Sequence, residues 1–254
     1  MLDEGVARVL SVPFSLASVW RPGLRRCGFA GPSWSVWFAR LNRLARGVGV
    51  VQRTTGNFRV YTSARREGAL AFSSVPADPT TDEPGAYELT AVARDGHEVE
   101  GVADLEPGML VHATLSWRTE EPTVTELEVV RETTFSFARE VTGLFEAAQE
   151  TWADAKGRGE GVNSRVTRNT DGEENGALYT FAEQPGERDL FEEFRTGVRP
   201  LDPLLARVDA GDDAGGAREV FVLDPVEHRC VVVYVALNRD GVLASTVRDT
   251  YEIE

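Results

Sequence analysis

Apolar and polar positions alternate in short runs along the chain after residue 55. Residues 57–64, with the sequence NFRVYTSA, place Phe58 and Val60 on one face and Arg59 and Tyr61 on the other. Strict alternation over such a run predicts a half-buried β-strand. Similar patterns predict four more strands, over residues 69–75, 87–93, 109–117 and 123–131.

Turn-forming residues separate these strands. Asp95-Gly96 is typical of a tight hairpin turn, and Glu106-Pro107-Gly108 marks another turn. Short strands at a spacing of roughly 8–12 residues indicate a sandwich or barrel. We therefore expect a small all-β domain over residues 55–137, with an OB-like barrel as its architecture. OB barrels usually carry a helix between the third and fourth strands, and no such pattern is evident, so other small barrels stay open.

The rest of the chain mixes helical and strand patterns. Residues 138–156 place apolar side chains at helical spacing, and Gly157 and Gly159 would end that helix. The fold class is therefore expected to be α+β, with an α+β domain over residues 138–254. Strands are predicted at 177–182, 219–223 and 230–237, and helices at 189–194, at 201–208 and near Leu243 to Tyr251.

Residues 1–50 do not share these patterns. They carry seven arginines against two acidic residues, a charge of +5, while the remainder carries −14 − 5 = −19. They also hold three of the five tryptophans. This basic segment is interpreted as a disordered extension or an upstream start-site artefact, with translation then beginning near Val50 or Val51. A basic arm for a membrane surface or nucleic acid is the alternative, whereas Asp3 and Glu4 precede the apolar part and argue against a signal peptide.

The overall charge balance points to an unusual ionic environment. The chain has 41 acidic and 27 basic residues, and Lys156 is its only lysine. Acid-rich, lysine-poor composition is typical of halophiles that accumulate salt, although a GC-rich genome also favours arginine. In molar salt the Debye length is roughly 3 Å, so net negative charge is weak evidence against nucleic-acid binding.

Other composition features exclude several classes of protein. Two cysteines and three histidines leave no disulfide scaffold and no histidine-rich metal site. No apolar run is long enough to span a membrane as a helix. We expect a cytoplasmic protein without a cofactor or a bound metal.

Three longer segments carry a resemblance to a known family. These are VTGLFEAAQETWADAKGRGEGVNSRVTRNTDGEENGALYTFAE, FEEFRTGVRPLDPLLARV and GVLASTVRDTYE. Residues 55–251 are similar to an uncharacterised family of haloarchaeal proteins of unknown function. The resemblance implies a halophilic, archaeal setting and transfers no catalytic residue.

The candidate binding residues of the first domain are aromatic and arginine side chains on strands. Bases would stack on the rings and arginines would contact phosphates if these residues shared one exposed face. The alternative is that the aromatic rings belong to the core. The residues are Arg59, Tyr61, Tyr87 and Trp117.

Arginines of the second domain supply two further candidate sites. Asn163, Arg165 and Arg168 lie in a polar run in which Arg165 could bind a phosphate or carboxylate. The alternative is a solvated hairpin with turns at Asp171-Gly172 and Asn175-Gly176. Arg195 and Arg199 join two predicted helices and could bind an anion there. The alternative is that they pair with the abundant carboxylates.

The leading hypothesis is a non-catalytic binding module that engages single-stranded nucleic acid or a protein partner through the barrel. A second hypothesis is an enzyme that acts on an anionic small substrate at an arginine-rich cleft between the two domains. No nucleophile–base motif supports it, and no catalytic residue is assigned. A third is an interaction protein without a small-molecule site.

Overall fold

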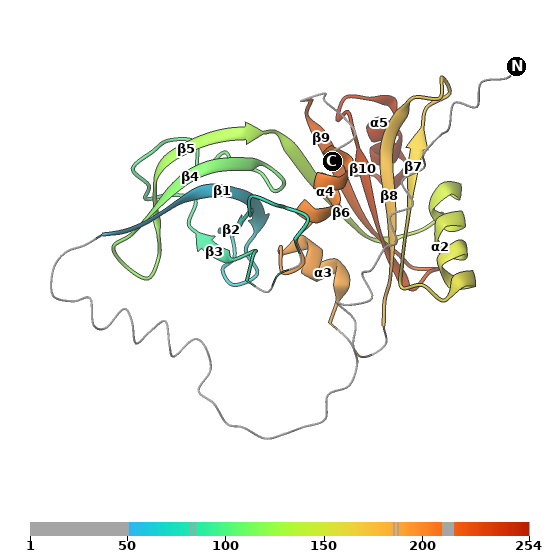
Figure 1. Cartoon of the computed structure of the whole chain (residues 1–254), viewed down its shortest axis with the longest axis horizontal. Coiled ribbons are helices and arrows are strands. Elements are labelled where there is room, and N and C mark those ends of the chain that lie inside the picture. Colours follow the sequence, from blue (N-terminus) through green and yellow to red (C-terminus); the bar gives the residue numbers. More distant parts are fainter. Residues whose placement is uncertain are drawn as a thin grey trace, which may run out of the picture. The chain divides into compact units, whose positions relative to one another are not determined.

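The computed structural model describes residues 51–81, 83, 85–184, 186, 188–209 and 216–253. The predictions made for residues 1–50 lie outside these described residues. Val51–Glu254 forms one compact unit. Its fold is mixed α and β, with two five-stranded sheets and a few helices (Figure 1).

The first sheet contains the five strands that alternation predicted. Its strand order is β3-β2-β1-β4-β5 and every pairing is antiparallel. Strand β1 is central, because its first part pairs with β4 and its last part pairs with β2. The strands are β1 (Gln52–Thr62), β2 (Leu70–Ser74), β3 (Leu89–Val92), β4 (Leu110–Trp117) and β5 (Thr123–Arg131).

The first sheet curves around its own hydrophobic core. Phe58 and Val60 of β1 contribute to that core, as their place in the alternation predicts. At the start of β5 the backbone of Val124 bonds to a loop instead of a strand. His97 Nδ1 accepts a hydrogen bond from the Val124 N–H at 3.1 Å, and the Glu98 N–H donates one to the Val124 carbonyl at 3.0 Å.

The second sheet has the order β6-β9-β10-β8-β7, with β6 and β9 parallel and the other pairs antiparallel. Strand β6 follows β5 after the single residue Glu132, so one long stretch of chain forms an edge of both sheets. The strands are β6 (Thr133–Val141), β7 (Val162–Arg168), β8 (Glu174–Ala182), β9 (Arg218–Pro225) and β10 (Cys230–Ala236).

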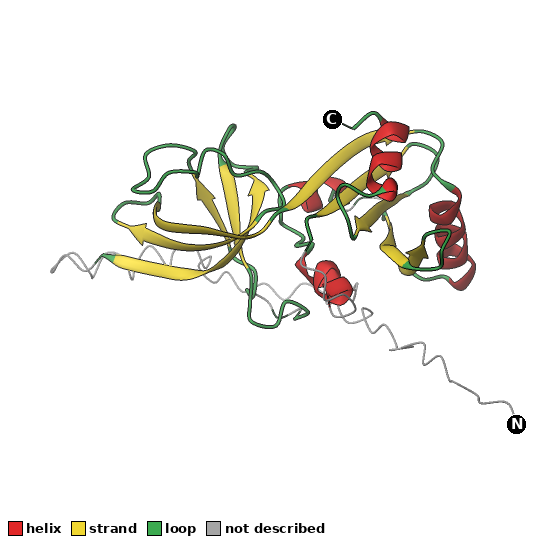
Figure 2. Cartoon of the chain, turned by 90° about the horizontal axis from the view of Figure 1, so that it is seen from above, coloured by secondary structure: helices red, strands yellow, loops and turns green. Residues whose placement is uncertain are grey.

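Helices cover both faces of the second sheet (Figure 2). Buried residues of α2 (Glu146–Arg158) and α5 (Val242–Tyr251) share one core with one face of the sheet. Buried residues of α3 (Leu190–Arg195) and α4 (Asp202–Asp209) share a second core with the other face. Tyr61 and Ala71 of the first sheet also belong to this second core.

The helix predicted from residue 138 begins later. Residues 138–141 complete strand β6, and α2 starts at Glu146. Ala138 pairs with Leu223 and Val141 pairs with Pro225, so pairing with β9 prevails over a helical apolar spacing. A bulge at Glu140, whose φ is +54°, marks the end of this strand.

None of the helices within the described part of the chain combines the length and apolar character that crossing a membrane requires.

Candidate functional site

The aromatic and arginine side chains predicted at the end of β1 are buried. Tyr61 is 0% exposed and Arg59 is 5% exposed. The Tyr61 hydroxyl accepts a hydrogen bond from the Leu201 N–H at 3.0 Å, and its ring lies 5.5 Å from that of Phe135. Arg59 forms an ion pair with Asp202 at 2.9 Å. The expectation that these side chains are exposed is therefore wrong, because the second half of the chain packs on this face of β1.

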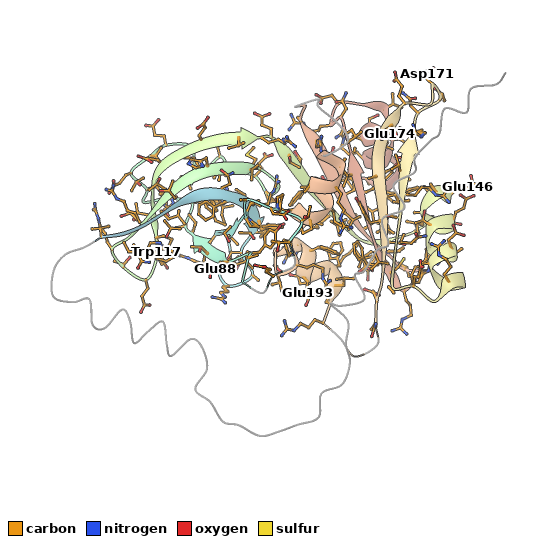
Figure 3. All side chains as sticks on the ribbon, viewed as in Figure 1. Glu88, Trp117, Glu146, Asp171, Glu174 and Glu193 are labelled. Carbon is orange, nitrogen blue, oxygen red and sulfur yellow. The ribbon has the colours of Figure 1, made fainter. Side chains whose placement is uncertain are left out.

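The other two predicted aromatic residues lie elsewhere. Tyr87 is half-buried and donates its hydroxyl to the Pro79 carbonyl at 2.6 Å. Partial burial, and then the charge of Asp202, raise the pKa of this phenol. Trp117, labelled in Figure 3, belongs to the first sheet. It packs against the first-sheet core, and its indole N–H donates to Thr54 Oγ1 at 3.2 Å. Tyr61, Tyr87 and Trp117 therefore do not form a shared exposed platform for stacking.

The arginines predicted on β7 are paired with carboxylates. Arg165 contacts Glu150 of α2 at 2.6 Å, and Arg168 contacts Glu174 of β8 at 2.6 Å. Asn163 donates from its side chain to the Thr151 carbonyl at 2.9 Å. Strand β7 is the sheet edge opposite β6. These contacts join β7 to its neighbours α2 and β8.

The arginines at the end of α3 are also paired. Arg195 bonds to Glu192 and Arg199 contacts Glu193 at 3.5 Å. They lie on the helical layer opposite α2, so the structure does not bring them together with Arg165. Pairing with carboxylates is thus what the structure shows for each of these arginines.

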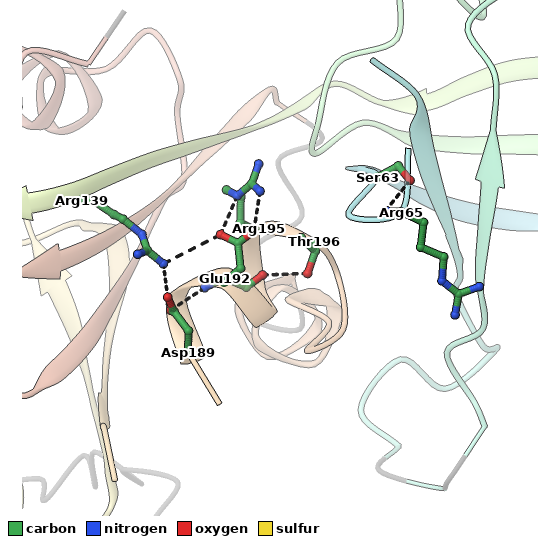
Figure 4. A network of polar contacts seen from close by, with 7 residues as sticks. All are labelled: Ser63, Arg65, Arg139, Asp189, Glu192, Arg195 and Thr196. Carbon is green, nitrogen blue, oxygen red and sulfur yellow. Dashed lines mark hydrogen bonds and ion pairs between the residues drawn. The ribbon is translucent and has the colours of Figure 1, made fainter. Parts of the chain in front are cut away.

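A polar network holds α3 against β6 (Figure 4). Asp189 caps the helix by accepting from the Glu192 N–H at 3.0 Å, and it also bonds to Arg139 of β6. Arg139 lies over the Phe191 ring, with 4.6 Å from its guanidinium carbon to the ring centroid. The hydrogen bond from Arg195 lowers the pKa of Glu192 and keeps it charged. These contacts position the helix and leave both Arg139 and Arg195 paired with carboxylates.

A cleft of about 610 Å³ runs along the outer edge of β6. Its floor is five consecutive strand residues, Thr134–Ala138, and its walls are Glu106–Pro107 and Tyr251–Ile253. Successive side chains of a strand point to opposite faces, so a cleft that touches all five follows the strand's edge. The cleft therefore borders the side of β6 that has no neighbouring strand in the second sheet.

Backbone groups of β6 point into this cleft. The Phe135 N–H donates to the Pro107 carbonyl at 3.0 Å, which shows that it points away from β9. N–H and C=O groups alternate between the two sides of a strand, so those of Phe137 point the same way. An edge of this kind can accept a further strand.

Sequence reasoning missed this cleft. The alternation of Phe135 and Phe137 with Thr134 and Ser136 is a strand signal, but it lies where the predicted barrel gives way to the predicted helix. The three segments that form the cleft are far apart in sequence, and no motif joins them. Among the described residues, no group of three or more histidine, cysteine or acidic residues is placed to hold a metal ion.

Comparison with protein families matches residues 50–254 to the family of unknown function DUF6663. The protein belongs to this family. The DUF6663 match covers both sheets and the β6 cleft. Neither the curated proteins nor the solved structures give a match to the chain.

Proposed function

We propose that this DUF6663 protein is a non-catalytic binding protein whose partner is another protein. The observation that carries the proposal is the β6 cleft, where the strand edge beyond the Pro107 turn has no neighbouring strand and borders a cavity. An extended segment of a partner would add to the edge through main-chain hydrogen bonds and fill the cavity with side chains. The loop before β4 supplies the Glu106–Pro107 wall, so the β-rich first half takes part in binding.

We also propose that the first sheet is a partly open, OB-like barrel. Support comes from the central position of β1 and from an ion pair of 2.8 Å between Arg66 and Glu121, which joins the β1–β2 and β4–β5 loops. OB barrels bind oligonucleotides on the face of their second and third strands and with these loops.

That face is covered here, which favours a protein partner over a nucleic acid. Ala71 and Ser73 of β2 are buried, and Ala71 shares a core with α3 and α4. Stacking of bases requires accessible aromatic rings, and Tyr61 on the same side is buried too.

We further propose that the protein works in the cytoplasm of a halophilic archaeon. The support is its acidic surplus of 41 against 27 and its single lysine. In concentrated salt, main-chain hydrogen bonds and apolar contacts hold a complex better than long-range charge attraction.

A strand-like peptide tests the proposed function. Full-length protein would be titrated into a fluorescein-labelled peptide of alternating threonine and valine, and fluorescence anisotropy recorded. We expect saturable binding, and we expect a peptide N-methylated at alternate residues to bind far more weakly, since it cannot pair on one edge. Glu106→Trp, which fills the mouth of the cleft, should abolish binding.

Glu88→Trp is the matched control, because Glu88 is exposed and does not line the cleft. Equal binding of the N-methylated peptide would contradict strand addition. Saturable binding of labelled single-stranded DNA or RNA in place of the peptide would overturn the choice of partner.

A further inference from the structure

Resting on the proposed function, we infer that the segment bound in the β6 cleft is a short extended stretch of another protein with an apolar centre and a basic side chain at each end. Three features of the cleft define this occupant: its length, the side chains along its floor and the charge of its walls.

The length of the cleft suits one short segment. Its floor of five residues, Thr134–Ala138, spans about 16 Å at about 3.3 Å per residue. The turn that carries Pro107 already bonds to the Phe135 N–H, so the chain itself closes one end of the edge. Sheet-to-sheet pairing with a second copy would bring two β6 edges together, and each edge is already partly covered by its own Pro107 turn. A single extended segment does not meet this obstacle.

The floor of the cleft favours an apolar centre. The Phe135 ring is buried in the core, 6.4 Å from the ring of the partly buried Phe137, so Phe137 is the phenylalanine that a bound segment could contact. Ala138, Pro107 and Ile253 add apolar surface around it. β-Branched or apolar side chains suit both this surface and an extended backbone.

The walls of the cleft favour basic ends. Glu106 and Glu252 come from different segments of the cleft lining, and both are exposed. Neither forms an ion pair with another described residue, whereas many arginines of this protein are held by carboxylates. Basic side chains on either side of the apolar centre would thus meet two available carboxylates from different segments of the lining.

Three labelled peptides with the same Thr-Val-Thr-Val centre test the inference, ending at both sides in arginine, serine or glutamate. With full-length protein in about 0.2 M KCl, where the Debye length is several ångströms, we expect the arginine peptide to bind about fivefold tighter than the serine peptide. The glutamate peptide should bind most weakly. The preference should shrink in about 3 M KCl, while the serine peptide still binds.

Variants identify the groups responsible. The double variant Glu106→Arg/Glu252→Arg should invert the order of the three peptides, and the control Glu88→Arg should keep it. Circular dichroism at each salt concentration verifies that the variants are folded.

The outcomes separate the two proposals. If the three peptides bind equally, this inference is overturned and the proposed function stands. If none binds, both are overturned. If light scattering shows a dimer that Glu106→Trp dissociates, the cleft holds a second copy and the inference is wrong.

Discussion

At the scale of single residues, Arg59 and Tyr61 show what an alternating pattern can and cannot predict. Their separation from Phe58 and Val60 onto opposite faces of β1 is confirmed. The burial of both faces could not be read from the pattern, because the groups that cover Tyr61, such as Leu201, lie far along the chain. A strand buried on both faces usually has a continuous apolar run. Here a paired arginine and a hydrogen-bonded tyrosine replace two of those apolar residues.

The ion pair between Arg59 and Asp202 gives a prediction at this scale. The two side chains are 6% and 2% exposed, so either group alone would be a buried, uncompensated charge. Arg59→Met should therefore lower the free energy of unfolding by about 3 kcal/mol. Arg59→Met/Asp202→Leu should come within about 1 kcal/mol of the wild type, because no charge is left unpaired. Urea denaturation of each variant measures both values.

An exposed pair serves as the control for that cycle. Arg66 and Glu121 are more than half exposed, so Arg66→Met should cost less than about 1 kcal/mol. Equal losses from Arg59→Met and Arg66→Met would show that burial of the Arg59 pair does not matter for stability.

At the scale of elements, eight of the ten described strands and the later helices lie where the sequence patterns predicted them. Strand β7 was not predicted, and neither was β6, whose last residues were predicted to begin a helix. Its pairing with β9 is parallel and joins residues more than eighty positions apart, for instance Thr133 with Arg218. Local spacing carries no information about such a partner. The cleft depends on this same strand, so the site was missed together with the element.

The turn that walls the cleft gives a prediction at the scale of elements. Gly108 has a φ of +105°, and a Cβ there would lie 2.5 Å from the Thr133 carbonyl oxygen and 2.7 Å from the Phe135 nitrogen. Gly108→Ala should therefore push the turn off β6 and lower the free energy of unfolding by about 3 kcal/mol or more. Thermal and urea denaturation would record the loss.

Gly68 provides the comparison for this substitution. Its φ is +75°, but a Cβ there would meet nothing within 4 Å, so Gly68→Ala tests backbone strain alone. We expect a loss of about 1 kcal/mol. If Gly108→Ala were no worse than Gly68→Ala, the contact between the turn and β6 would not be as close as the structure shows.

At the scale of the whole molecule, charge opposes compactness. Residues 51–254 hold 41 − 2 = 39 acidic and 27 − 7 = 20 basic residues. Even if every basic residue paired with one carboxylate, 39 − 20 = 19 carboxylates would have no such partner. Their mutual repulsion destabilises the folded state, and salt screens it. Salt also weakens exposed ion pairs, but each of these contributes little.

The free energy of unfolding should therefore rise with salt. Between about 0.2 and 3 M KCl, we expect an increase on the order of 2 kcal/mol that levels off as the Debye length approaches about 3 Å. Urea is the suitable denaturant, because it adds no ions. A triple variant, Glu88→Gln/Glu128→Gln/Glu227→Gln, removes three exposed carboxylates and should give a shallower dependence on KCl. A stability that is constant or falls with KCl would mean that ion pairs such as Arg165–Glu150 outweigh the repulsion, and that the acidic surplus is not an adaptation to salt.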